Sequence, residues 1–244
     1  MGMMQGDFIL ETRGLQKRFG GVRAVDGVDF QLRRGELRCL IGPNGAGKST
    51  FFKLLSGQLR PSAGTIGFEG VAIGGIAMHR IARLGIGIKN QVPSVFEGLA
   101  VHENLWLAAR SCHPARGAGG TVDDLIDRLG IRSFADRTVA SLAHGQRQWV
   151  EIGMIMARGP KLVLLDEPAA GMARHEVART AALIREINRD ASVIVVEHDM
   201  QFIRQLDALV TVFHQGRILV EDTMANIQHD PRVREIYLGS ARYA

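Results

Sequence analysis

The chain has 244 residues, 46% of them hydrophobic, which is enough to bury one substantial core. No apolar run approaches the roughly 18–20 residues that span a bilayer. Because the N-terminus also lacks a basic segment followed by an apolar one, we expect a cytosolic protein. The net charge is +5, from 30 basic and 25 acidic residues. The basic residues are scattered and not interleaved with aromatics, which weakens a nucleic-acid role and leaves an anionic membrane face or simple solvation.

The two cysteines, Cys39 and Cys112, do not have the spacing of metal ligands. Cys39 lies in an apolar run and is expected to be a small core residue. We assign no role to Cys112, which falls in a predicted loop.

In chain order, residues 8–38 predict antiparallel strands and turns, followed by a strand at 64–70, a helix at 76–84 and a strand at 85–91. The middle, 92–158, is mostly helical, with helices at 101–110, 122–129 and 145–158 and a flexible loop at 111–120. Strands at 161–165 and 192–196 then alternate with helices at 176–189 and 200–205. A hairpin at 208–220 and helices at 224–229 and 231–237 complete the chain.

This alternation predicts an α/β fold with a mostly parallel sheet. We expect one domain, residues 1–244. The core of this domain, residues 8–91 and 159–244, includes an antiparallel β part. Residues 92–158 form an inserted helical subdomain.

A glycine-rich loop dominates the sequence. An apolar run, Leu37–Ile41, precedes it and a predicted helix, Thr50–Leu59, follows. The loop fits the phosphate-binding pattern G-x-x-x-x-G-K-[ST], which arises by chance in about one per cent of chains this long. Its backbone N–H groups would bind phosphates, Lys48 would reach the outer phosphates and the Ser49 hydroxyl would hold Mg²⁺. The predicted nucleotide contacts are Gly42, Asn44, Gly45, Ala46, Gly47, Lys48, Ser49 and Thr50.

Polar residues close three of the predicted strands. Asp166 ends one strand and is expected to support Mg²⁺, while Glu167 is placed to activate the water that attacks the γ-phosphate. His198 could sense the γ-phosphate from the end of the next strand, where ligands gather in open parallel sheets. Gln91 could contact Mg²⁺ or the attacking water, although a single glutamine is weak evidence.

A second anion-binding helix N-terminus is predicted at Ser141–Gln146, about a hundred residues after the first loop. Because one loop already holds the phosphates, we interpret this segment as acting on the nucleotide of another subunit.

The chain resembles the ATP-binding subunit of ABC transporters along essentially its whole length. The resemblance rests on six features in this order: Phe19, the loop at 42–50, Gln91, Leu142–Gln146, Leu162–Glu167 and His198. The resemblance implies that Phe19 stacks on adenine with Val25 nearby. Without the resemblance, an aromatic residue such as Phe19 is expected to lie in the core. It makes Gln91 the Q-loop, Glu167 the catalytic carboxylate and His198 the switch histidine. The signature motif then contains Ala143, His144, Gly145 and Gln146.

The same resemblance implies ATP and Mg²⁺ as cofactors and a head-to-tail dimer with two ATPs between loop and signature. The partners would be a second, different ATPase subunit, two permease subunits and, indirectly, an extracytoplasmic solute-binding protein. The chain would lie peripherally on the cytoplasmic face of the membrane, with no nucleic-acid partner.

Closer features are similar to importers of the branched-chain amino acid and urea group. They include Phe19–Val25, Ala170–Met172, Glu197–Met200 and Tyr237–Gly239. The segments His144–Met154 and Val95–Glu97 look more like the urea or short-chain amide branch.

Two departures from the family pattern stand out. Ala143 and His144 replace the usual serine and glycine, so contact with a partner's γ-phosphate must come from backbone N–H groups such as that of Gly145. The usual acidic residue soon after Glu167 is also missing, which leaves open a different coupling of the two ATP sites and a weaker composite site.

Two alternatives remain at this point. A nucleic-acid-associated ABC ATPase of the repair or translation type would carry a long coiled-coil insertion or a second ATPase domain, and this chain has neither. A non-hydrolytic adaptor would bind ATP as a structural switch, and the intact set of Lys48, Asp166, Glu167 and His198 argues against it.

Overall fold

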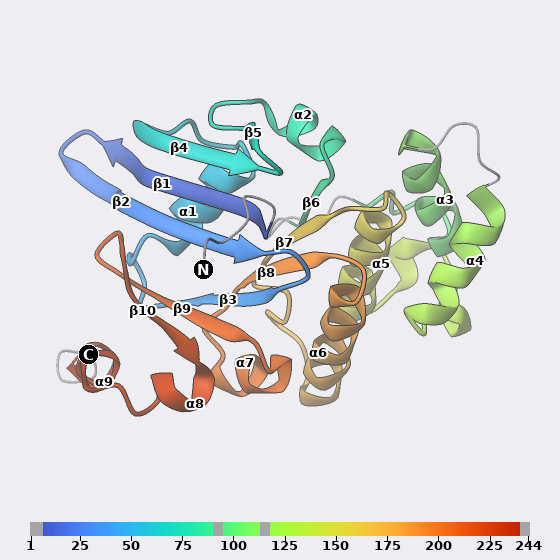
Figure 1. Ribbon diagram of the computed structural model, residues 1–244. Helices are drawn as coiled ribbons and strands as arrows, with labels where there is room; N and C mark the ends of the chain where they lie inside the picture. The colour runs from blue at the N-terminus through green and yellow to red at the C-terminus, as the bar shows by residue number, and fades with distance from the viewer. Residues whose placement is uncertain (1–6, 90–94, 113–117, 240–244) are drawn as a thin grey trace.

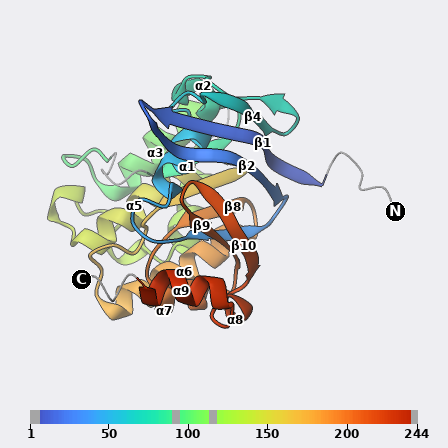
Figure 2. The same ribbon diagram turned by 90° about the vertical axis from the view of Figure 1, so that its left-hand side faces the viewer.

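The computed structural model describes residues 7–89, 95–112 and 118–239. Its layers are plain in Figure 1: a small antiparallel sheet lies above a larger mixed sheet, helices lie below, and a helical part projects to one side. The side view in Figure 2 shows the same layers, with the last helices beneath the larger sheet. The predicted α/β class, with its antiparallel part and helical insertion, is confirmed.

The antiparallel sheet has four strands in the order β2-β1-β4-β5. They are β1 (Phe8–Phe19), β2 (Val22–Arg33), β4 (Ala63–Phe68) and β5 (Val71–Ala72). The first two strands stay paired close to the turn that joins them, where Lys17 pairs with Val25 and Phe19 with Val22. Pairing therefore continues up to Phe19, the last residue of β1, which is followed by the Gly20–Gly21 turn.

The larger sheet has the order β10-β9-β3-β8-β7-β6, and all neighbours are parallel except β9 and β10. Its strands are β3 (Leu37–Ile41), β6 (Ile86–Lys89), β7 (Leu162–Asp166), β8 (Ser192–Val196), β9 (Leu209–His214) and β10 (Arg217–Thr223). The three central strands are buried along their whole length, as expected for parallel strands covered on both faces. Their carboxyl ends meet at one edge.

Two apolar cores lie on the two faces of this sheet. One packs α1 (Lys48–Leu55) between the larger sheet and the antiparallel sheet, around Phe51 and Phe52. The other covers the opposite face with α5 (His144–Met156), α6 (Arg174–Asn188) and α7 (Met200–Leu206). Alternate residues of one strand serve the two cores: Leu164 faces the first, and Val163 and Leu165 face the second.

The remaining helices are α2 (Met78–Arg83), α3 (Val101–Cys112), α4 (Ala118–Arg128), α8 (Met224–Ile227) and α9 (Pro231–Gly239). The prediction of a loop over 111–120 was wrong at 111–112 and at 118–120, because α3 continues to Cys112 and α4 begins at Ala118. Leu125 and Ile126 are buried in the core, and such packing outweighs the weak helix propensity of two glycines. The predicted helix at 50–59 begins earlier and ends at Leu55, two residues before the left-handed Gly57.

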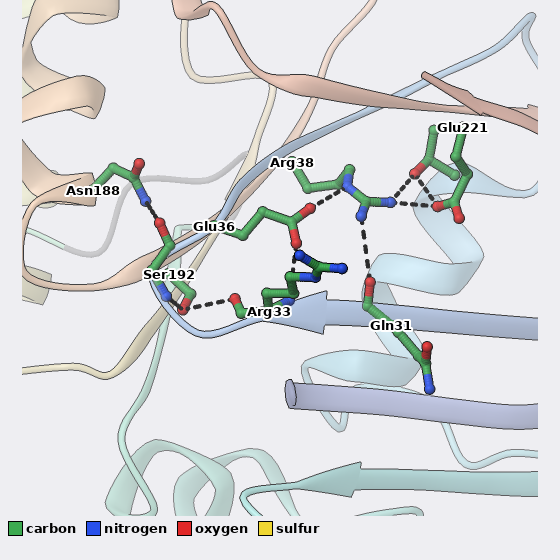
Figure 3. A network of polar contacts seen from close by, with 9 residues as sticks. Gln31, Arg33, Glu36, Arg38, Asn188, Ser192 and Glu221 are labelled. Atoms are coloured by element: carbon green, nitrogen blue, oxygen red, sulfur yellow. Dashed lines mark hydrogen bonds and ion pairs between the residues drawn. The ribbon is translucent and has the colours of Figure 1, made fainter. Parts of the chain in front are cut away.

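A buried cation fixes the start of β3 against its neighbours (Figure 3). The Arg38 guanidinium bonds to Glu36 at 2.6 Å, to Thr211 at 2.8 Å and to Glu221 on the edge strand. Glu36 in turn accepts a hydrogen bond from the Arg33 N–H at 2.9 Å. Because this network joins β2, β3, β9 and β10, it holds the strand that feeds the glycine-rich loop.

Candidate active site

The glycine-rich loop joins β3 to α1 in a conformation that only glycine adopts easily. Gly42 has φ 147° and Gly47 has φ 105°. An added Cβ on Gly42 would lie 2.3 Å from the Phe213 carbonyl oxygen, and one on Gly47 would lie 2.4 Å from the Ala24 carbonyl oxygen. The loop is thus packed directly against the backbone of β2 and β9.

A backbone bridge holds the loop in place. The Gly216 N–H donates to the Ala46 carbonyl at 2.9 Å, and the Asp26 N–H donates to the Gly216 carbonyl at 2.8 Å. Arg217 adds an ion pair to Asp26 at 2.7 Å. The loop is therefore preformed by the turn between β9 and β10 and by β2.

Lys48 begins α1, as the loop pattern predicts. Its ammonium donates to the carbonyl of Gly42 at 2.6 Å and to that of Pro43 at 3.1 Å. Burial lowers the pKa of Lys48, and the nearby carboxylates of Glu167 and Asp166 oppose that shift. The ammonium thus bonds to the backbone of its own loop, where phosphate oxygens would replace the two carbonyls as acceptors.

Asp166 and Glu167 close β7 at the same edge of the sheet. Burial raises the pKa of Asp166, and the adjacent Glu167 raises it further. Glu167 has a left-handed backbone, φ 46°, which is strained for a residue with a side chain. Its Oε1 lies 3.2 Å from Nδ1 of His198, which follows β8. The structure thus brings the predicted general base and the predicted sensor histidine into hydrogen-bond distance.

Glu197 is a site residue that the sequence analysis missed. It is 2% exposed, and burial raises its pKa. Its carboxylate accepts hydrogen bonds from the backbone N–H groups of Ala169 at 3.3 Å and His198 at 3.0 Å. Glu197 therefore ties the loop after Glu167 to the loop that carries His198. Its position at the end of an apolar strand was the one signal available.

The donor set fits a magnesium ion. Mg²⁺ in nucleotide sites is held by one or two protein oxygens together with phosphate oxygens. Ser49 on α1 and Asp166 on β7 supply such oxygens beside the glycine-rich loop. Among the residues described, no group of three His, Cys, Asp or Glu side chains is arranged to hold a metal without a phosphate.

The segment Ala143–Gln146 forms the start of α5. Ala143 has no side-chain oxygen to cap the helix, and its own N–H donates to Gln146 Oε1 at 3.1 Å. Nε2 of His144 lies 2.7 Å from Gln148 Nε2, which also donates to the Ala170 carbonyl at 3.3 Å. This chain joins the start of α5 to the loop that follows Glu167, a connection the sequence did not reveal.

Gly145 is buried, and an added Cβ would come 2.4 Å from Glu176 Oε1. The position thus has no room for a side chain unless Glu176 moves.

The other predicted contacts fall in different environments. Phe19 is 48% exposed, with the Lys17 ammonium 5.1 Å from its ring centroid, so the predicted core position is wrong and the ring is open to stacking. Val25 is fully buried in the core, so its side chain supports the β2 backbone and would have to move to touch a nucleotide. Gln91 lies outside the residues that the structure describes.

Residues 25–170 match the model of the family described as ABC transporter. This chain belongs to the ABC transporter family. It is 34% identical to the high-affinity branched-chain amino acid transport ATP-binding protein BraF of Pseudomonas aeruginosa, over 96% of this chain and 98% of that protein. It is also 34% identical to the corresponding protein LivG of Salmonella typhimurium, over 96% and 98%.

A crystal structure of an ATP-binding cassette of an ABC transporter in its ADP conformation superposes with a TM-score of 0.82. It shares 27% sequence identity, and the match covers 95% of this chain and 99% of that one. The present chain binds ATP and is an ATPase coupled to transport. No helix in the described parts of the chain is both long and apolar enough to cross a membrane.

Proposed function

We propose that this chain powers the import of a small polar solute, with Glu167 as the general base of ATP hydrolysis. The observation that carries the proposal is the meeting of Glu167 with His198 at 3.2 Å, beside the loop that holds Lys48. A base within hydrogen-bond reach of its orienting partner is the arrangement that water activation needs. In this role Asp166 and Ser49 hold Mg²⁺, which would supply charge neutralisation on the phosphates.

The exposed start of α5 supports a composite site. A helix N-terminus favours anions, and Ala143–Gln146 presents one that the chain's own loop does not require. We propose that this segment contacts an ATP held by a second ATPase subunit, and that Gln91 and Phe19 contact Mg²⁺ and adenine on this chain's own nucleotide. Permease subunits would then anchor the pair at the cytoplasmic face of a membrane.

The solute is one of three chemical types. The named relatives act in branched-chain amino acid transport, which favours those amino acids. The stretch from His144 to Met154 favours urea or a short-chain amide instead. Nucleic-acid binding gains no support from the scattered basic residues.

Reconstituted uptake tests the proposal. The chain is co-purified with its permease subunits, placed in vesicles with the solute-binding protein, and supplied with ATP and labelled leucine, urea or acetamide. We expect ATP-dependent uptake of one of the three, lost in a Glu167→Gln complex. ATP hydrolysis without uptake of any of them would refute the importer function, and salt-dependent binding to DNA or RNA would favour the alternative.

A further inference from the structure

A buried ion pair lies between the larger sheet and the helix that begins at the signature segment. Lys89, the last residue of β6, is 2% exposed, and Glu151, on α5, is 4% exposed. Lys89 Nζ lies 3.8 Å from Glu151 Oε2. Removing both charges from water costs several kcal/mol per ion, and apolar residues of similar size often stabilise a protein as well or better. Stability alone therefore does not explain the pair.

The same two elements are in close steric contact two residues earlier on the strand. A Cβ added to Gly87 would lie 2.3 Å from Ile155 Cγ2 and 3.3 Å from Pro160 Cβ. Residues two apart on a strand share a face, and residues four apart on a helix share a stripe. Gly87 and Lys89 thus meet Ile155 and Glu151 along one seam, with a steric contact at one end and the ion pair at the other.

Both ends of this seam lead to the active site. Lys89 is the β-sheet partner of Leu165, the residue before Asp166. Its ammonium is also within electrostatic reach of Asp166 and Glu197. The helix that carries Glu151 begins at His144, in the segment offered to a partner's ATP.

We propose that Lys89 is a positioning residue for ATP hydrolysis. Through its ion pair with Glu151, Lys89 holds α5 in register with the larger sheet. The segment Ala143–Gln146 at the start of α5 is thereby held in place relative to the strand ends that carry Asp166 and Glu197. Apolar contacts would seal the seam but are non-directional. An ion pair with one cation and one carboxylate fixes that register. A change far from the chemistry that misplaces the reacting groups by about 1 Å can cost about a hundredfold in rate.

This inference rests on the proposed function, because register matters only if the α5 segment acts on ATP. The test compares Lys89→Met, Glu151→Leu and the double variant in the full chain, in the assembly that supports wild-type turnover. Melting temperature, nucleotide affinity, kcat and KM are measured for each. Each single variant removes one charge of the buried pair and leaves the opposite charge in a low-dielectric site, so it should melt lower than the wild type.

The double variant separates the two roles of the pair. We expect it to regain the melting temperature and nucleotide affinity of the wild type while kcat stays at least about tenfold lower, with KM little changed, since only the register is lost. The single variant Lys89→Arg keeps the positive charge and should retain most of the wild-type kcat. Wild-type kcat in the double variant, or a loss of nucleotide affinity equal to the loss of kcat, would overturn the proposal.

Glu151→Asp provides a second test if the double variant does not fold. It keeps both charges but shortens the carboxylate arm by one methylene, so we expect reduced kcat with normal nucleotide affinity. Normal kcat in this variant contradicts the proposal. A wild-type assembly without ATPase activity would refute the proposed function itself, whereas an active wild type with active Lys89 and Glu151 variants refutes only this inference.

Discussion

Replacing Gly47 with alanine tests whether the glycine-rich loop is preformed by its packing. Gly47 precedes α1 with φ 105°, and an added Cβ would lie 2.4 Å from the Ala24 carbonyl oxygen and 3.2 Å from Gly216 Cα. All of these neighbours are backbone atoms, which cannot rotate away as a side chain can. Gly45 provides a matched control, because its φ of 78° is also left-handed but nothing lies within 4 Å of its added Cβ.

The structure sets the size of the effect. A left-handed backbone costs about 1–3 kcal/mol for a residue with a side chain, and a forced contact adds about 1–3 kcal/mol. Gly47→Ala should therefore lower the free energy of unfolding by about 2–6 kcal/mol, and Gly45→Ala by about 1–3 kcal/mol. At roughly 2–4 °C per kcal/mol for a chain of this size, the first variant should melt at least about 4 °C below the wild type.

Thermal unfolding followed by circular dichroism without nucleotide measures both variants, so that altered phosphate binding does not enter. The difference between them isolates the contact with Ala24. Equal melting temperatures for Gly47→Ala and Gly45→Ala would show that the loop can move away from β2, and the account of a preformed loop would then be wrong.

Burial raises the pKa of the Cys39 thiol to about 12, so at pH 8 only about one part in 10⁴ of the thiol is thiolate. In a variant with Cys112 replaced by serine, the native chain should react with a thiol reagent at least a hundredfold more slowly than the unfolded chain. Equal reaction rates would contradict this prediction. The Lys161 ammonium lowers the pKa of the Glu69 carboxyl. The ionised Glu69 therefore contributes to folding stability above its ordinary pKa near 4.5, and this contribution is lost as the pH falls through the lowered pKa. Wild type should therefore unfold at a higher urea concentration than Glu69→Gln at pH 7, and the gap should narrow as the pH is lowered below the ordinary pKa. A gap that stays constant with pH would refute the assignment. Arg38→Met removes the cation shared by Glu36 and Glu221 and should destabilise the chain by about 1.5–3 kcal/mol in urea unfolding, whereas a loss below about 1 kcal/mol would show that the Arg38 network is not needed.

The sequence was most informative where the local pattern decides structure. The glycine-rich loop lies between a strand and a helix as expected, and the strand at 192–196 has its predicted bounds, because an apolar run between charged residues admits few other structures. Asp166, Glu167 and His198 were placed correctly at strand ends, since parallel strands bring their carboxyl ends to one edge.

Long-range contacts could not be predicted in this way. Glu197 gave no sign that its carboxylate would join two loops, and Lys89 gave no sign that it would meet Glu151 across a seam. The link from His144 through Gln148 to Ala170 likewise depends on how α5 packs beside the loop after β7. Such pairs are set by tertiary packing, which one chain's periodicity does not encode.

The role of Glu167 is tested most directly by measuring phosphate release and retained ATP in the wild type and in Glu167→Gln. The substitution keeps the shape of the side chain and removes its ability to accept a proton. General base catalysis contributes about 10²–10⁴-fold, so we expect phosphate release to slow by at least a hundredfold while ATP affinity changes little. Phosphate release at the wild-type rate in Glu167→Gln would contradict the account of this site.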